Sequence, residues 1–174
     1  MDLVSFTAAE KAAYSDEMLR MMQRSDREFV PPLSSRASTT EKHLSGHDAT
    51  GNVLPYFEEM MRQEIIAAFE DGVLLGYLSY RINYTNEVID TLPNVYLSTM
   101  ISRPEARGRG FSKNLYLRLL NDLYPDCDFF TRTWSTNAVQ FHIFGKLGFE
   151  EFYRIPDDRG PGIDTVYFRL LRDK

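Results

Sequence analysis

The stretch from Arg107 to Ser112 reads Arg-Gly-Arg-Gly-Phe-Ser, and its residue types predict chemistry more directly than any other part of the chain. It follows an apolar run typical of a strand, residues 94–101, and precedes a run typical of a helix, residues 114–124. Two glycines at such a junction let the backbone turn tightly, and a helix start adds free N–H donors and partial positive charge. Together these features predict a pocket for a phosphate or pyrophosphate.

Three kinds of phosphate-binding loop compete for this stretch. A Walker loop requires G-x-x-x-x-G-K-[ST], and the sequence contains no such run. A dinucleotide-binding fingerprint requires a third glycine where Lys113 stands. The third pattern, [QR]-x-x-G-x-[GA], is the coenzyme A loop of the GNAT acetyltransferases. The sequence resembles that loop through Arg107 and Gly110, with Ser112 as a small departure at the last position.

A second segment strengthens the resemblance. Residues 137–149 read N-A-V-Q-F-H-I-F-G-K-L-G-F, similar to the later GNAT signature in which an Asn opens a helix that ends in a Gly-Phe pair. The interval from Asn137 to Gly148 is the usual one in that family, and the motif-level resemblance covers residues 94–152. It implies an α/β fold with a central, twisted, mostly antiparallel sheet and one βαβ crossover at the coenzyme A loop. Residues 1–174 would form a single N-acetyltransferase domain.

Hydrophobic periodicity and turn residues predict the elements that hold these motifs. Thr7 and Glu10 form a capping-box pattern for a helix to Ser25, on which methionines at helical spacing predict a core face. Asp71-Gly72 predicts a hairpin turn. We expect strands over residues 3–6, 65–69, 73–82, 95–101, 129–134, 149–155 and 164–171, and further helices over residues 114–124 and 137–147.

A second capping-box pattern, Ser38 to Glu41, predicts a short helix carrying His43 and His47. Their spacing would place both imidazoles on one helical face, as a metal site requires. Because no third ligand stands nearby in the sequence, we favour a solvated face and expect no metal.

Composition limits the class of function. The net charge of −5 argues against a general nucleic-acid binder and is compatible with an amine acceptor. No apolar run approaches membrane-spanning length, so no membrane partner is expected. The single cysteine, Cys127, cannot form an internal disulfide, and no signal peptide is apparent, which favours a cytoplasmic location.

The resemblance implies a set of residues that bind acetyl-CoA as cosubstrate. A backbone N–H at the end of the strand before the loop, at Met100, Ile101 or Ser102, would polarise the thioester carbonyl. The glycine loop would hold the phosphates, Asn137 would cap its helix and touch the pantetheine arm, and an aromatic residue would lie beside the cofactor. The complete expected set is Met100, Ile101, Ser102, Arg107, Gly108, Arg109, Gly110, Phe111, Ser112, Lys113, Asn137 and Phe144.

The residues for proton transfer are less well defined. The strand over residues 95–101 contains no acid, and Glu87 precedes it as a candidate base acting through water. Phe144 occupies the helix position where the family often has a tyrosine acid, and His142 lies about 200° away around the helix. An acid is not required, because an alkyl thiol has a pKa of about 8.5. The catalytic candidates are Ser102, Glu87 and His142.

The loop over residues 157–164 is rich in charged and turn residues, which predicts either a solvated hairpin turn or a lid over the acceptor. In the second case Asp157, Asp158 or Asp164 would hold an ammonium and Arg159 a carboxylate. Trp134, Arg132 and Tyr153 could face the same cleft.

The predicted activity is acetyl transfer to a primary amine of a small molecule, with a protein acceptor less favoured. The alternative is a non-catalytic sensor that binds acyl-CoA, favoured by Phe144 and by the missing acid on the preceding strand. The resemblance also allows a homodimer.

Overall fold

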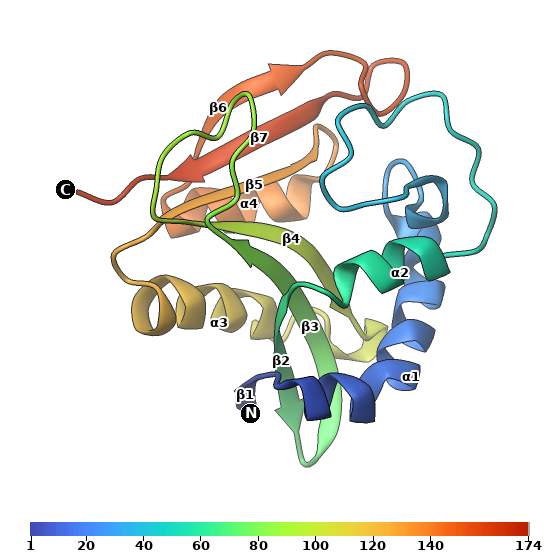
Figure 1. Cartoon of the computed structure of the whole chain (residues 1–174), viewed down its shortest axis with the longest axis vertical. Coiled ribbons are helices and arrows are strands. Elements are labelled where there is room, and N and C mark those ends of the chain that lie inside the picture. The colour runs from blue at the N-terminus through green and yellow to red at the C-terminus, as the bar shows by residue number, and fades with distance from the viewer. Residues whose placement is uncertain (174) are drawn as a thin grey trace.

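The computed structural model describes residues 1–173, which contain a seven-stranded sheet in the order β1-β2-β3-β4-β5-β7-β6 (Figure 1). Neighbouring strands are antiparallel except β4 and β5, which run parallel. The mixed α/β fold with one βαβ crossover at the glycine loop is therefore confirmed. The strands are β1 (Asp2–Ser5), β2 (Glu64–Glu70), β3 (Val73–Ile82), β4 (Asn94–Ser102), β5 (Asp128–Trp134), β6 (Glu150–Ile155) and β7 (Thr165–Leu170).

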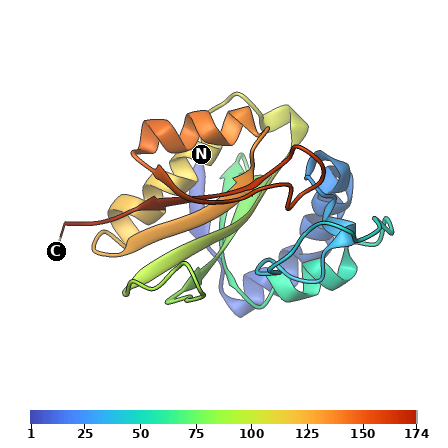
Figure 2. The ribbon, with the colours of Figure 1, turned by 90° about the horizontal axis from the view of Figure 1, so that it is seen from above.

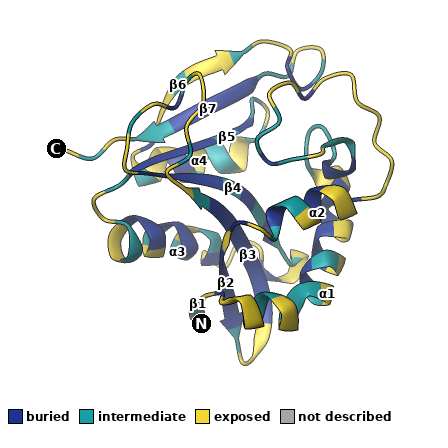
Figure 3. Ribbon diagram, in the orientation of Figure 1, coloured by how far each residue is buried: buried dark blue, intermediate teal, exposed yellow. Residues whose placement is uncertain are grey.

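Helices cover both faces of the sheet. The blue α1 (Ala8–Ser25) and the green α2 (Leu54–Met60) lie on one side, and α3 (Phe111–Leu117) and α4 (Ala138–Leu147) lie on the other (Figure 2). A π-helix over Arg118–Leu123 continues α3 toward β5. Strands β2, β3, β4, β5 and β7 are largely buried, whereas β6 at the edge is mostly exposed; other exposed residues gather in connections and on outer helix faces (Figure 3).

Local sequence signals explain where several elements begin. The Thr7 hydroxyl accepts the Glu10 N–H, and the Glu10 carboxylate accepts the Thr7 N–H, so the capping box at the start of α1 is confirmed. Asp71 and Gly72 both have positive φ, 51° and 77°, as a type I′ hairpin turn between β2 and β3 requires.

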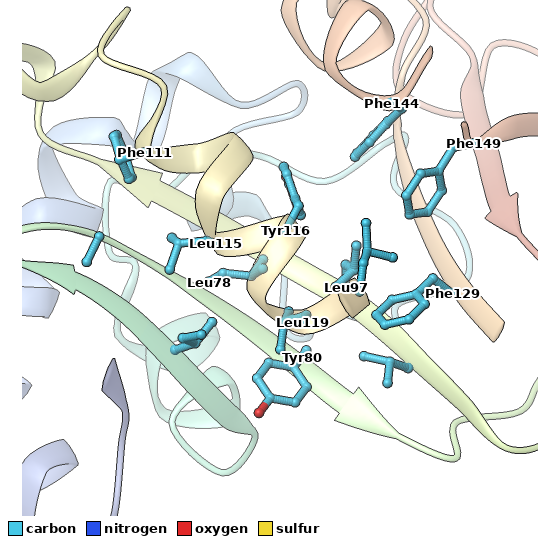
Figure 4. Packing of buried hydrophobic residues seen from close by; sticks show 14 of the residues in the cluster. Leu78, Tyr80, Leu97, Phe111, Leu115, Tyr116, Leu119, Phe129, Phe144 and Phe149 are labelled. Carbon is cyan, nitrogen blue, oxygen red and sulfur yellow. The ribbon is translucent and has the colours of Figure 1, made fainter. Parts of the chain in front are cut away.

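Two hydrophobic clusters hold the helices to the sheet. Met18, Met21 and Met22 of α1 are buried with residues of β2 and β3, which confirms the predicted core face. On the opposite face, Phe111, Leu115 and Leu119 belong to one buried cluster with Leu78 of β3, whose side chain lies beside Leu115 (Figure 4). Burial of such side chains contributes about 1.5–3 kcal/mol each to folding.

Gly76 of β3 permits the close approach of α3. A Cβ at this position would lie 2.5 Å from Cε2 of Phe111 and 2.6 Å from the carbonyl oxygen of Ile101. Any larger residue would therefore push the start of α3 away from β3. The glycine of a central strand thus fixes the position of the loop that precedes the helix.

The structure differs from the sequence-based predictions at three places. Residues 38–47 form turns, because the Ser38 hydroxyl accepts the Thr40 N–H and the Glu41 carboxylate accepts the Ala37 N–H, so no capping box forms. Helix α2 was not predicted from the sequence. The helix expected from residue 114 begins at Phe111, directly after the left-handed Gly110.

Candidate active site

The two parallel strands of the sheet separate before they end. β4 and β5 pair only from Asn94–Leu97 against 128–131, although β4 continues to Ser102 and β5 to Trp134. A cavity of about 890 Å³ opens where they diverge, within the usual range for ligand sites. Residues from the ends of both strands line it, together with the glycine loop, α4, and the loops that hold Arg36 and Arg159.

The backbone of β4 presents hydrogen-bonding groups to this cavity. The Arg103 N–H donates to the Leu75 carbonyl of β3, 2.8 Å away. Because N–H groups alternate between the two edges of a strand, those of Met100 and Ser102 face away from β3 toward the cavity, and that of Ile101 faces β3. The side chain of Ile101 is buried in the cluster beneath α1 and does not line the cavity.

The glycine loop contributes further N–H donors. Gly108 and Gly110 have φ of 74° and 78°, a conformation that residues with a Cβ rarely adopt. The Asn114 N–H bonds to the Gly110 carbonyl at 3.2 Å, so the N–H groups of Ser112 and Lys113 precede the helical hydrogen bonding. These residues line the cavity, and no atom lies within 4 Å of a Cβ built on either glycine. The loop therefore leaves room for a ligand against its backbone.

Charge around the cavity is strongly asymmetric. Six basic side chains line it: Arg36, Arg107, Lys113, Arg132, Lys146 and Arg159. Among the described residues that line it, Glu28 carries the one carboxylate, and its two oxygens accept Nη2 of Arg107 at 2.7 and 2.9 Å. A cavity of this charge in a chain of net charge −5 is suited to anionic ligands.

Helix α4 brings a second set of groups to the cavity. Asn137 caps it by accepting the Gln140 N–H at 3.4 Å and donates to the Thr133 hydroxyl at 2.9 Å. His142 and Phe144 both line the cavity; the side chain of His142 is exposed, and that of Phe144 is buried. Among the described residues that line the cavity, Tyr116 is the one next to Phe144 that carries an aromatic hydroxyl. The centres of the two rings are 5.7 Å apart.

Tyr116 is held in its protonated form. Its hydroxyl donates to Oε1 of Gln140 at 3.2 Å, and burial raises its pKa well above the ordinary value for a phenol. A buried phenol hydroxyl thus lies next to the aromatic position at which the sequence has Phe144.

Comparison with known proteins agrees with this architecture. The model of the acetyltransferase (GNAT) family matches residues 22–149. The chain belongs to the GNAT family. GNAT acetyltransferases use acetyl-CoA as their cosubstrate. Among curated proteins, no relative of this GNAT acetyltransferase was found by sequence.

Several solved structures share the fold at low identity. A ribosomal-protein-alanine N-acetyltransferase from Brucella melitensis has a TM-score of 0.67 and 15% identity, over 99% of this chain and 100% of that chain. YncA from Salmonella typhimurium, solved with its cofactor acetyl-CoA, has a TM-score of 0.66 and 17% identity, over 100% of this chain and 95% of that chain. An N-acetyltransferase from Staphylococcus aureus has a TM-score of 0.66 and 13% identity, over 98% of each chain. These likenesses concern the fold.

Glu87 lies outside the cavity. The side chain is exposed and pairs with Lys42 at 2.8 Å, and this hydrogen bond lowers the pKa of Glu87. Arg109 also points outward, to Glu70. Neither residue has the position that its expected role requires, because each is held on the surface by an ion pair.

Three of the expected acceptor residues likewise lie outside the cavity lining. Tyr153 is exposed on β6. Asp158 is buried, accepts the Thr165 hydroxyl and lies 3.7 Å from Nδ1 of His43. Asp164 accepts the Asp157 N–H and pairs with Arg154, which lowers its pKa, so it stabilises the hairpin turn. Trp134 and Arg159 do line the cavity.

The sequence analysis missed Glu28, Arg36 and Tyr116. Glu28 and Arg36 flank the Pro31-Pro32 pair, and no spacing signal relates them to the glycine loop. Tyr116 lies five residues after Phe111 on the helix that follows the loop, so its position on a cavity-facing helix was the available signal. Among residues 1–173, no group of three or more metal-ligating side chains comes together. No helix in this part of the chain is long and apolar enough to cross a bilayer.

Proposed function

We propose that this GNAT acetyltransferase transfers the acetyl group of acetyl-CoA to the primary amine of a small-molecule acceptor in the cytoplasm, as a single domain. The observation that carries this proposal is the cavity between the diverging ends of β4 and β5, with the glycine loop in its wall. Its N–H donors and basic side chains suit the phosphates of a coenzyme A substrate. The free edge of β4 suits the amides of the pantetheine arm.

The chemistry required is attack of an amine nitrogen on the thioester carbonyl. A C–N bond forms, the C–S bond breaks, the amine loses a proton and coenzyme A leaves as its thiol. The N–H groups of Met100 and Ser102 are candidates to stabilise the carbonyl oxygen, because strand alternation turns them toward the cavity. This role does not depend on the side chain of either residue.

We favour Glu28 as the general base that deprotonates the amine. Its carboxylate is in the cavity wall and can accept the proton directly or through a water molecule. The pairing with Arg107 holds the carboxylate at the start of the glycine loop. His142 remains a second candidate, since it also lines the cavity.

Tyr116 is the proposed proton donor to the departing thiolate. We expect Tyr116→Phe to lower kcat about tenfold with little effect on folding. Tyr80→Phe provides a matched control, because Tyr80 is also buried, but its hydroxyl faces Tyr124 at 3.4 Å outside the cavity. Equal kcat values for the two variants would remove Tyr116 from the mechanism.

A small-molecule acceptor is favoured over a protein because the cavity is lined by buried side chains from loops on several sides. Arg159 is 5% exposed, and Tyr56 and Thr99 hydrogen-bond to each other at 2.6 Å in the cavity wall. A non-catalytic sensor of acyl-CoA would not require such a lined space beyond the cofactor loop.

Binding of acetyl-CoA is the first property to test. A thermal melt at a hundredfold excess over the dissociation constant should show about 2.7 kcal/mol of stabilisation, or a rise in Tm of about 5–10 °C. ATP and NAD serve as controls. An equal shift with ATP, or no shift with acetyl-CoA, would contradict the proposed cosubstrate site.

A further inference from the structure

Three arginines from distant parts of the chain meet in the cavity wall. Arg36 follows the short 3₁₀ helix Leu33–Ser35, Arg132 lies on β5, and Arg159 lies in the connection between β6 and β7. Arg36 and Arg132 are close enough to act on the charge of Arg159, and Arg132 on that of Arg36, whereas Tyr96 and Tyr167 outweigh burial and keep the pKa of Arg132 above its ordinary value. Burial first, and then the charges of Arg36 and Arg132, lower the pKa of Arg159 to about 9. Burial and Arg132 likewise contribute to lowering that of Arg36 to about 10.

Neutral groups hold these guanidinium groups in place. Arg36 donates through Nε and Nη2 to the Pro31 carbonyl at 3.0 and 2.6 Å. Arg132 donates through Nη2 to the Thr39 carbonyl at 3.3 Å. Arg159 donates through Nε to the Thr165 hydroxyl at 3.0 Å and through Nη1 to the Val30 carbonyl at 2.9 Å. None of these partners carries a charge.

Each of the three groups also lies over an aromatic ring. The guanidinium carbon is 5.8 Å from the ring centre of Phe29 for Arg36, 6.0 Å from that of Tyr167 for Arg132, and 5.9 Å from that of Trp134 for Arg159. The rings of Phe29 and Trp134 are in turn 5.7 Å apart. The three cations are therefore fixed in orientation before any ligand binds.

No carboxylate forms an ion pair with these three groups among the described residues, although the buried Asp158 accepts the same Thr165 hydroxyl to which Arg159 donates. Among the described residues, seven other arginines pair with acidic side chains: Arg81, Arg103, Arg107, Arg109, Arg118, Arg154 and Arg169. Arg36, Arg132 and Arg159 form no such pair there. The hydrogen bonds above leave Nη1 of Arg36 and Nη2 of Arg159 without a partner in the described part of the chain. Arg159 is buried, and Arg36 and Arg132 are partly buried. Three desolvated cations that no ion pair neutralises are suited to an anion supplied from outside.

We infer that the acceptor is a primary amine that also carries a carboxylate, and that Arg36, Arg132 and Arg159 bind this carboxylate. The planar, rigid donor groups of arginine suit the two oxygens of a carboxylate. Glu28 lines the same cavity and directly precedes Phe29 in the sequence. Its carboxylate would attract the ammonium group of the acceptor. This inference rests on the proposed acetyl transfer to an amine.

The test compares matched pairs of L-amino acids and their carboxamides. The members of a pair share the amine and the side chain and differ in the negative charge. Two readouts are needed: initial rates of thiol release with acetyl-CoA, and calorimetric binding of each compound to the protein saturated with coenzyme A. We expect kcat/KM and affinity to be at least tenfold higher for the carboxylate in the pairs that are bound.

Arg159→Met should reduce that preference to less than threefold and leave binding of acetyl-CoA unchanged. Arg132→Gln is a second variant should the first fail to fold. Arg154→Gln is the matched control, because Arg154 belongs to the same hairpin but pairs with Glu151 and Asp164 outside the cavity.

The two readouts separate the inference from the proposed function. Selective binding of carboxylates without thiol release would uphold the anion site and contradict acetyl transfer. Thiol release that is equal for both members of every pair would uphold acetyl transfer and overturn the anion site. Absence of selective binding together with absence of thiol release would overturn both.

Discussion

The carboxylate of Glu28 holds Nη2 of Arg107 between its two oxygens, at 2.7 and 2.9 Å, and so links the segment after α1 to the start of the glycine loop. Both residues are about half exposed, with side-chain exposures of 48% and 44%, so the pair contributes little to stability. Its importance lies in position. It places the cavity's one described carboxylate next to a cation of the cofactor loop.

Replacing Glu28 tests its proposed role as base. We expect Glu28→Gln to lower kcat/KM for amine acceptors by tenfold or more, because the amide cannot accept the proton. Glu70→Gln is the control, since it removes the equivalent partner of Arg109 outside the cavity. Wild-type kcat/KM in a folded Glu28→Gln protein would assign the base elsewhere.

Gly110 and Gly72 form a natural matched pair. Both have positive φ, 78° and 77°, and neither has an atom within 4 Å of an added Cβ. Substitution by alanine should cost each variant about 1–2 kcal/mol of stability. Only Gly110→Ala should also weaken acetyl-CoA binding, by tenfold or more, because its Cβ would occupy space that the ligand needs. Equal affinities for the two variants, measured by calorimetry, would show that the loop does not contact the cosubstrate.

Gly76 tests the packing that positions the loop. Gly76→Ala should lower the free energy of unfolding by about 1–3 kcal/mol, because the new methyl group overlaps Phe111 and the Ile101 carbonyl. Gly145→Ala on α4 is the control: its Cβ has no neighbour within 4 Å, and we expect a gain of about 0.5–1 kcal/mol. Urea unfolding measures both. A neutral Gly76→Ala would mean that α3 can move without cost.

The capping box of α1 gives a pH-dependent prediction. Hydrogen bonds from the Thr7 N–H and hydroxyl lower the pKa of Glu10 below its ordinary value of 4.5. A lowered pKa in the folded state means that the stabilisation is present above pH 4.5 and is lost as the pH falls through the folded-state pKa. Wild type should therefore exceed Glu10→Gln in Tm at pH 7, and the difference should vanish in acid. A difference in Tm between wild type and Glu10→Gln that stays constant with pH would contradict the assignment.

The elements that sequence analysis located are those with local signals. Thr7 with Glu10, the Asp71-Gly72 turn, and the Asn137 cap each act within a few residues, so their patterns could be read directly. Helix α2 was missed because it has seven residues and begins beside Pro55, at the end of a polar stretch. Its first turn is supported by the side chain of Asn52, which accepts the Leu54 N–H.

The site was only partly predictable for a related reason. The glycine loop is contiguous, so its residues could be identified together. Arg36, Arg132 and Arg159 are brought together by the pairing of β5 with β7 and by the path of the loop after α1, and neither is visible in residue spacing. Glu87 illustrates the opposite error: it lies near β4 in sequence, but the loop before the strand carries it to Lys42 on the surface.

The most direct test of the account is the rate of coenzyme A thiol release from acetyl-CoA in the presence and absence of amines. We expect thiol release that requires the amine and reaches a maximum rate as the amine concentration rises. One acetylated product should form for each thiol released. Tight binding of acetyl-CoA with no amine-dependent release across a broad panel would contradict it and favour a sensor of acyl-CoA.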